Sequence, residues 1–119
     1  MVDQSPEVRA ALRDVLAAEP DIEVVADTGS GLEAIRLAAT HRPSVTVFDA
    51  QLGDQHLRAL RRFHHHQPHV GIVAFSGFEL QLPEEQLASM GIAEMLIKGA
   101  HIRLVLDAVR RAARIADRP

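Results

Sequence analysis

Short runs of apolar and β-branched residues alternate along this chain with segments of helical hydrophobic spacing. Four of these runs predict strands, at Ile22–Ala26, Val45–Phe48, Gly71–Phe75 and Glu94–Ile97. Strands that alternate with helices form parallel sheets with right-handed connections. The order therefore predicts an α/β fold built on a doubly wound parallel sheet. No linker or repeat divides residues 1–119, and this length suits a single domain.

Local signals mark where the helices begin. Ser5 precedes Pro6 at the start of the first helical segment, and a serine there accepts a hydrogen bond from a free backbone N–H. Ser30 and Glu33 have the spacing of a capping box, which predicts the start of the second helix. Three further helices are predicted around Leu57, after Pro83 and over Ile102–Ala116.

Composition excludes several classes of protein. The chain has no cysteine, which excludes disulfides, thiol catalysis, zinc fingers and iron–sulfur clusters. The formal net charge is −3 and there is no Trp or Tyr, so direct binding of nucleic acid is not expected. No apolar run reaches the roughly 20 residues of a membrane span, and the start lacks the pattern of a signal peptide. We therefore expect a cytoplasmic protein without membrane contact.

Polar residues follow three of the predicted strands at the point where each strand ends: Asp49, Ser76 and Lys98. Asp3 would join them if the residues before it formed a strand. Because the carboxyl ends of parallel strands meet at one edge of a sheet, we expect these side chains to lie together. Asp49 could attack a phosphoryl group whose oxygens Lys98 and Ser76 contact. Taken singly, each residue also has a purely structural explanation, as a turn residue or a solvated side chain.

The order and spacing of several segments resemble the receiver domains of response regulators, and most of all those of the NarL/FixJ group. The segments that carry the resemblance are Val2–Arg9, Glu19–Val25, Phe48–Asp49, Ser76–Gly77 and Lys98. They are spread over almost the whole chain. The resemblance implies a flavodoxin-like three-layer sandwich that works in a two-component phosphorelay rather than as an enzyme.

The resemblance also implies roles for individual residues. It makes Asp49 the phosphoacceptor, Lys98 its charge partner and Ser76 the switch hydroxyl. Mg²⁺ would be held by Asp3, Asp49 and the backbone carbonyl of Gln51. The implied partners are a sensor histidine kinase, a second copy of the chain, and an output domain in a longer parent chain.

Three departures from the family pattern qualify these roles. Gln4 stands where receivers carry a second acid, so one negative charge for Mg²⁺ is missing. The loop from Ala50 to His56 lacks the usual proline and looks one residue short, and Met95 replaces the aromatic switch residue. These departures predict weak Mg²⁺ binding. They leave open a second function, that of a pseudo-receiver which binds or dimerises without phosphorylation.

The first strand of the implied fold is the largest departure, because only Met1 and Val2 precede Asp3. That strand normally lies inside the sheet, and each unpaired buried backbone group costs about 1–3 kcal/mol. Four explanations stay open. The chain may be cut from a longer one, its start may be misplaced, a partner may donate a strand to form a dimer, or the sheet may close directly.

A histidine-rich run, His64–His66 followed by His69, lies at the end of the third predicted helix. Imidazole binds nickel, copper or zinc. Adjacent histidines on a helix do not face one another, so a solvated helix end is the favoured interpretation.

Overall fold

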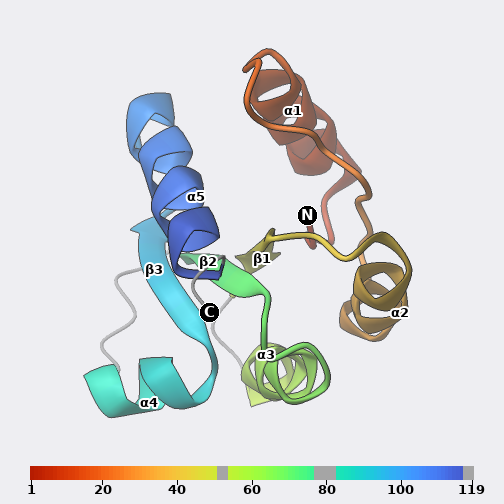
Figure 1. Ribbon diagram of the computed structural model, residues 1–119, viewed down its shortest axis with the longest axis vertical. Helices are drawn as coiled ribbons and strands as arrows, with labels where there is room; N and C mark the ends of the chain where they lie inside the picture. The colour runs from red at the N-terminus through yellow and green to blue at the C-terminus, as the bar shows by residue number, and fades with distance from the viewer. Residues whose placement is uncertain (51–53, 77–82, 117–119) are drawn as a thin grey trace.

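The computed structural model describes residues 1–50, 54–76 and 83–116, with side chains described for all of these except 54–56. Figure 1 shows a sheet between two groups of helices. The elements in chain order are α1 (Pro6–Ala17), α2 (Gly31–His41), β1 (Val45–Asp49), α3 (Asp54–His66), β2 (Gly71–Ser76), α4 (Glu84–Ser89), β3 (Ile92–Ile97) and α5 (Ile102–Ala116).

The sheet is parallel, with the strand order β1-β2-β3. Asp49 lies opposite Phe75, and Ser76 lies opposite Ile97, so the three strands end at one edge. These observations confirm the predicted α/β class and parallel sheet. Each strand extends slightly beyond its predicted range, because Asp49, Ser76 and Ile92 also pair with their neighbours.

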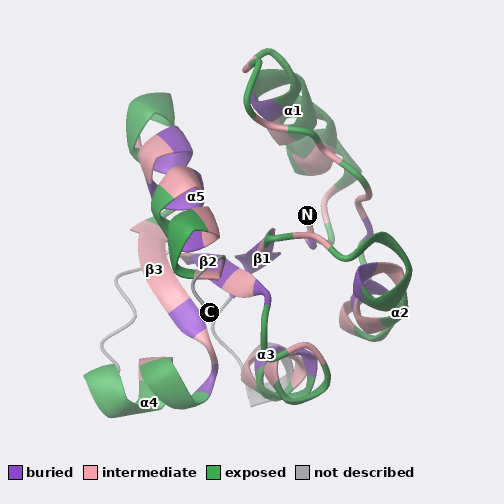
Figure 2. Ribbon diagram, viewed as in Figure 1, coloured by how far each residue is buried: buried purple, intermediate pink, exposed green. Residues whose placement is uncertain are grey.

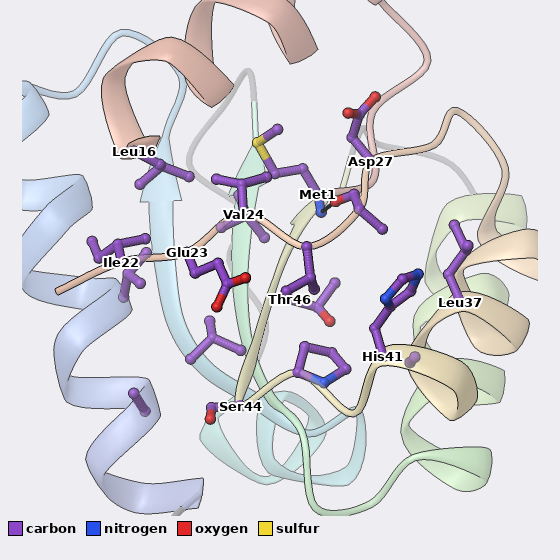
Figure 3. Close-up of a pocket in the computed structure, with 18 of the residues that line it drawn as sticks. Met1, Leu16, Ile22, Glu23, Val24, Asp27, Leu37, His41, Ser44 and Thr46 are labelled. Atoms are coloured by element: carbon purple, nitrogen blue, oxygen red, sulfur yellow. Dashed lines mark hydrogen bonds between the residues drawn. The ribbon is translucent and has the colours of Figure 1, made fainter. Parts of the chain in front are cut away.

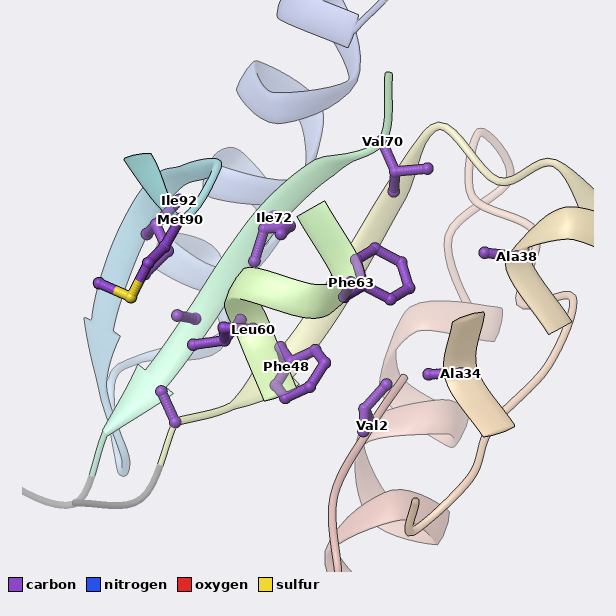
Figure 4. Close-up of a cluster of buried hydrophobic side chains, with 12 residues drawn as sticks. Val2, Ala34, Ala38, Phe48, Leu60, Phe63, Val70, Ile72, Met90 and Ile92 are labelled. Atoms are coloured by element: carbon purple, nitrogen blue, oxygen red, sulfur yellow. The ribbon is translucent and has the colours of Figure 1, made fainter. Parts of the chain in front are cut away.

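One hydrophobic cluster joins the sheet to α2 and α3 (Figure 4). Phe48 of β1 and Phe63 of α3 are buried, with ring centroids 6.1 Å apart in an edge-to-face arrangement. Ala34 and Ala38 bring α2 against the same cluster. The burial of these large side chains is the main force that holds this face together.

The second cluster lies on the other face, between the sheet and α1 and α5. Val47 and Val73 point into it from the strands, and Val109 and Ala112 from α5. Gly71 allows the close approach of α5, because a Cβ atom there would lie 2.8 Å from the backbone oxygen of Ala112. By contrast, Leu16 is the buried residue of α1, and most of that helix is exposed (Figure 2).

The first strand is present as a stub. Val2 forms isolated parallel bridges with Thr28 on one side and Phe48 on the other. Its N–H donates to the Val47 carbonyl at 2.8 Å, and its carbonyl accepts from the Asp49 N–H at 2.8 Å. On the other side, Met1 O accepts from Thr28 N at 3.0 Å. The stub therefore closes the sheet at the edge where the strands end.

The predicted strand at Ile22–Ala26 is wrong, because the structure assigns no strand there. An apolar run becomes a strand only when a neighbour supplies hydrogen bonds, and Met1 bonds only Ala26 of this segment, beside Thr28 beyond its end. The two serine caps are confirmed. Ser5 Oγ accepts from the Val8 N–H at 3.3 Å, and Ser30 Oγ accepts from the Glu33 N–H at 3.2 Å.

The expectation that the histidine run is a solvated helix end holds only in part. His65 and His66 are exposed, as expected, but His64 is half-buried beside Gly91. Its Nδ1 atom is buried and has no hydrogen-bond partner among the described residues. No helix in the described ranges is long and apolar enough to cross a membrane.

Candidate functional site

Asp49 and Lys98 meet where the strands end. Asp49 is the last residue of β1, with a side chain only 3% exposed, and Lys98 directly follows β3. The Lys98 backbone N–H donates to the Ser76 carbonyl at 2.7 Å, which extends the ladder by one residue. This bond places the Lys98 side chain so that its Nζ lies 3.0 Å from Asp49 Oδ1.

The carboxylate of Asp49 is buried, and neither of its oxygens accepts a hydrogen bond from a described residue. The contact with Lys98 is an ion pair without the geometry of a hydrogen bond. A buried carboxylate ordinarily has its lone pairs satisfied, since leaving them unpaired costs free energy. Asp49 therefore has lone pairs that no described residue satisfies with a hydrogen bond.

A small cavity of about 90 Å³ opens beside Asp49. Its lining residues are Val2, Asp3, Gln4, Gly29, Gly31, Phe48, Asp49 and Ala59. The volume exceeds the roughly 30 Å³ share of one water molecule, so it can hold a cation with part of its hydration shell. Asp3 and Gln4, which follow the stub, therefore line the same cavity as Asp49, the candidate phosphoacceptor.

The donor set of this cavity fits Mg²⁺ in part. Mg²⁺ commonly binds through one or two carboxylates and several waters, and Asp3 and Asp49 supply two carboxylates. One oxygen of Asp3 already accepts from the Ser5 N–H at 2.8 Å, and Gln4 brings a neutral amide. Within the described ranges no three acidic, histidine or cysteine side chains gather around a common point.

Ser76 and Gln51 complete the predicted set. Ser76 lies at the same edge of the sheet, at the end of β2, and is fully buried. Gln51, whose backbone carbonyl was expected to bind the metal, lies outside the described residues. Met95 is half-buried in β3 and packs against the cluster that contains Phe48.

Arg9 is a positioning residue that the sequence did not reveal. Its Nη1 donates to the Asp3 carbonyl at 2.6 Å, and its Nε pairs with Asp27 at 3.2 Å. Arg13 also pairs with Asp27. These contacts hold the acidic turn against α1. Only the spacing of arginines four apart on one helix face hinted at a shared partner.

Gly29 and Gly31 line the cavity, although the sequence indicated only a turn at this place. A Cβ atom on Gly29 would lie 3.0 Å from Arg9 Nη1 and 3.5 Å from the Asp3 carbonyl oxygen. A side chain there would crowd the turn that carries Asp3. The glycine–serine–glycine pattern was the available signal, and its relation to Asp3 depends on the tertiary structure.

Comparison with known proteins places the chain in a family. Residues 1–110 match the family described as response regulator receiver domain. The chain is 32% identical over 76% of its length to protein-glutamate methylesterase/protein-glutamine glutaminase 1 of Methanosarcina acetivorans, and covers 26% of that protein. It is 25% identical over 95% of its length to response regulator protein VraR of Staphylococcus aureus, and covers 54% of it. The chain thus spans between about a quarter and a half of these relatives.

Solved structures show the same fold. The response regulator domain of Thermotoga maritima CheB superposes with a TM-score of 0.80 at 22% identity, over 95% of this chain and 92% of that one. The signal receiver domain of NarL from Mycobacterium tuberculosis gives 0.81 at 19% identity, over 95% and 92%. The chain belongs to the response regulator receiver domain family, and so to the modules of two-component signalling.

Proposed function

We propose that this receiver domain accepts a phosphoryl group on Asp49 from a sensor histidine kinase. The observation that carries the proposal is the state of Asp49, a buried carboxylate that lies beside a lysine ammonium and whose oxygens accept no hydrogen bond from any described residue. Its lone pairs are therefore not engaged by hydrogen bonds within the described ranges. Phosphoryl transfer depends mainly on positioning and on neutralising charge, which this arrangement supplies.

In the proposed step an Asp49 oxygen forms a bond to phosphorus as the bond between phosphorus and the histidine nitrogen breaks. The bonding pair returns to the imidazole of the kinase. Lys98, 3.0 Å from Oδ1, neutralises negative charge on the carboxylate and then on a phosphoryl oxygen. Ser76, which ends β2 at the same edge of the sheet, then donates a hydrogen bond to another phosphoryl oxygen. Mg²⁺, held by Asp3 and Asp49, would neutralise further phosphoryl charge when bound.

We expect weak Mg²⁺ binding. Gln4 lines the cavity with a neutral amide, whereas a carboxylate at this position would add a negative charge. In addition, one carboxylate oxygen of Asp3 already accepts a hydrogen bond from the Ser5 N–H. Fewer anionic ligands lower the affinity for a hard divalent cation. A Gln4→Glu variant is expected to bind Mg²⁺ about tenfold more tightly, the direction that added ligand charge gives in cation sites.

The test is phosphorylation by acetyl phosphate with Mg²⁺, read by intact-protein mass. The wild-type chain should gain the mass of one phosphoryl group, and Asp49→Asn should gain none. Asp14→Asn is the matched control, because Asp14 is exposed on α1 and does not line the cavity beside Asp49. A mass gain that persists in Asp49→Asn would refute the proposal. So would no gain in the wild type at saturating Mg²⁺, an outcome expected of a phosphorylation-independent binding module.

A further inference from the structure

Lys98 lies in the turn that connects the last strand to the last helix. β3 ends at Ile97 and α5 begins at Ile102, so this connection is short (Figure 1). The Ala100 N–H donates to the Ile97 carbonyl at 3.0 Å, which closes a β-turn with Lys98 and Gly99 at its centre. The lysine of the candidate site is therefore a turn residue, and its position depends on the geometry of that turn.

Gly99 gives this turn its conformation. Its φ angle is +91°, whereas Lys98 has a negative φ, because Arg42 is the non-glycine residue with a positive φ in the described ranges. A negative φ followed by a positive one is the pattern of a type II turn, which favours glycine at its third position. In that conformation the side chain of another residue would crowd its own backbone, which costs free energy. The turn therefore depends on the residue at position 99.

The space around Gly99 shows that this requirement is conformational. A Cβ atom placed there would have no described heavy atom within 4 Å beyond the glycine and its two neighbours in the chain. Gly71 differs, because a Cβ atom there would overlap the backbone oxygen of Ala112. A substitution at position 99 thus changes the preferred backbone angle of the turn without displacing a packed neighbour.

Both sides of the turn are fixed, so a change at Gly99 cannot be absorbed far away. On the strand side, the Lys98 N–H donates to the Ser76 carbonyl at 2.7 Å. On the helix side, His101 Nδ1 accepts from the Arg103 N–H at 3.0 Å, as an N-cap side chain does at the start of a helix. Residues 99 and 100 lie between these two points. A strained turn must therefore rotate Lys98 or disturb the start of α5.

The helix resists such a movement more strongly than the lysine does. Val105, Ala108 and Ala112 of α5 are buried in the second cluster, and moving the helix would disturb all of these contacts. The Lys98 side chain is 32% exposed and has room to move toward solvent. We therefore expect strain in the turn to displace Lys98.

Such a displacement acts on the candidate phosphoacceptor. Lys98 Nζ lies 3.0 Å from Asp49 Oδ1, and no described residue donates a hydrogen bond to that carboxylate. The attraction between two charges falls with their distance, and at a buried carboxylate water compensates little of the loss. The turn that directs the Lys98 side chain thus controls the counter-charge of Asp49.

We propose that Gly99 is a positioning residue for phosphoryl transfer to Asp49, because its positive φ fixes the turn that directs the Lys98 ammonium to the carboxylate. Gly99 acts through Lys98, which neutralises charge on the carboxylate and then on a phosphoryl oxygen. This role in transfer rests on the proposed function. The placement of Lys98 by Gly99 does not, and it can be measured without phosphorylation.

The first test compares Gly99→Val with Gly99→Asn, the matched control at the same exposed position. Asparagine tolerates a positive φ, whereas a β-branched residue does not. In each background a double-mutant cycle of Lys98→Met and Asp49→Asn, read from urea midpoints, measures the coupling of the pair. The coupling should fall about twofold or more in Gly99→Val and should match wild type in Gly99→Asn.

A glycine that only stabilised the fold would lower the urea midpoint and leave this coupling unchanged, and that result in Gly99→Val would refute the proposal. An equal fall in both variants would also refute it, because the added side chain and not the φ angle would then be responsible. If circular dichroism shows that Gly99→Val is unfolded, Gly99→Ala replaces it, since its Cβ meets no described neighbour.

The second test is the initial rate of phosphorylation by acetyl phosphate at saturating Mg²⁺. Gly99→Val should react about tenfold more slowly than wild type, as expected when a charged group leaves its productive position, and Gly99→Asn within about twofold of wild type. A Gly99→Val rate equal to that of wild type would refute the role in transfer. If wild type itself gains no phosphoryl group, the proposed function fails, and the coupling still decides whether Gly99 places Lys98.

Discussion

Asp49 and Lys98 form a pair of unequal burial. The Asp49 side chain is 3% exposed and that of Lys98 is 32% exposed. The lysine can hydrate if the pair is broken, whereas the carboxylate would remain buried without a counter-charge. Removing a partner of a buried charge is costly because of the charge left behind. Stability measurements can therefore separate the two members of the pair.

We predict that Lys98→Met lowers the free energy of unfolding by about 1–3 kcal/mol at pH 7, a buried-pair cost reduced for the exposure of Lys98. In an Asp49→Asn background the same substitution should cost less than about 0.5 kcal/mol, because no buried charge remains. Urea denaturation of the four proteins measures both values. Arg36→Met is the control, since its contact with Glu33 is exposed. An equal loss in both backgrounds would show that Lys98 stabilises the fold through contacts other than the one with Asp49.

At the scale of elements, α1 and the segment after it are attached to the rest by apolar contacts with the second cluster and by ion pairs to α5. Leu16 is the buried residue of α1, while Arg110 of α5 bonds Glu19 and Asp21. The hydrogen bond from Arg110 lowers the pKa of Asp21 below its ordinary value. Because the folded-state pKa is lowered, this contribution is present above the unfolded value near 4 and is lost as the pH falls through the folded value.

We predict that Arg110→Met destabilises the protein at pH 7 and that the difference from wild type shrinks as the pH falls below about 4. The difference should also shrink in 1 M salt, where the screening length is about 3 Å. Thermal unfolding at several pH values measures it. Arg103→Met, exposed on the same helix, should show no such dependence. A difference that stays constant down to pH 3 would mean that Arg110 acts through packing alone.

Sequence patterns predicted the strands correctly where each strand has a neighbouring strand in the sheet. Val45–Phe48 and Gly71–Phe75 became strands because each has a partner, while Ile22–Ala26 has an equally good pattern but pairs with no described strand. Periodicity reports which faces are apolar, not whether a backbone finds its hydrogen bonds. The same limit applies to the site. Strand ends predicted the meeting of Asp49 and Lys98, but the contacts of Arg9 and Gly29 depend on tertiary packing.

The whole molecule divides into a tightly packed part and a loosely packed part. The three paired strands and α5 bury most of the second cluster, whereas most of α1 is exposed (Figure 2) and residues 21–28 line a cavity. Local stability follows buried contacts and protected hydrogen bonds. The two parts are therefore expected to open with different free energies.

We predict that amides of α1 exchange through local opening, at a free energy at least about 2 kcal/mol below that of β2 amides, which should exchange only by global unfolding. Native-state hydrogen exchange at rising denaturant concentrations measures both. Amides of α5 near Ala108 are the internal reference, because that residue is fully buried. If α1 and β2 amides exchange at the same free energy, the two parts unfold together as one unit.

The position of the Met1 nitrogen has a practical consequence for preparing this protein. This atom donates to the Ala26 carbonyl, and Met1 lines a cavity of about 650 Å³ between β1 and residues 21–28 (Figure 3). Any polypeptide fused ahead of that atom must thread between two walls of backbone before it reaches solvent. An affinity tag attached directly ahead of Met1 would therefore become part of the interior. Preparations that differ in what precedes Met1 should be treated as different molecules in stability and binding work.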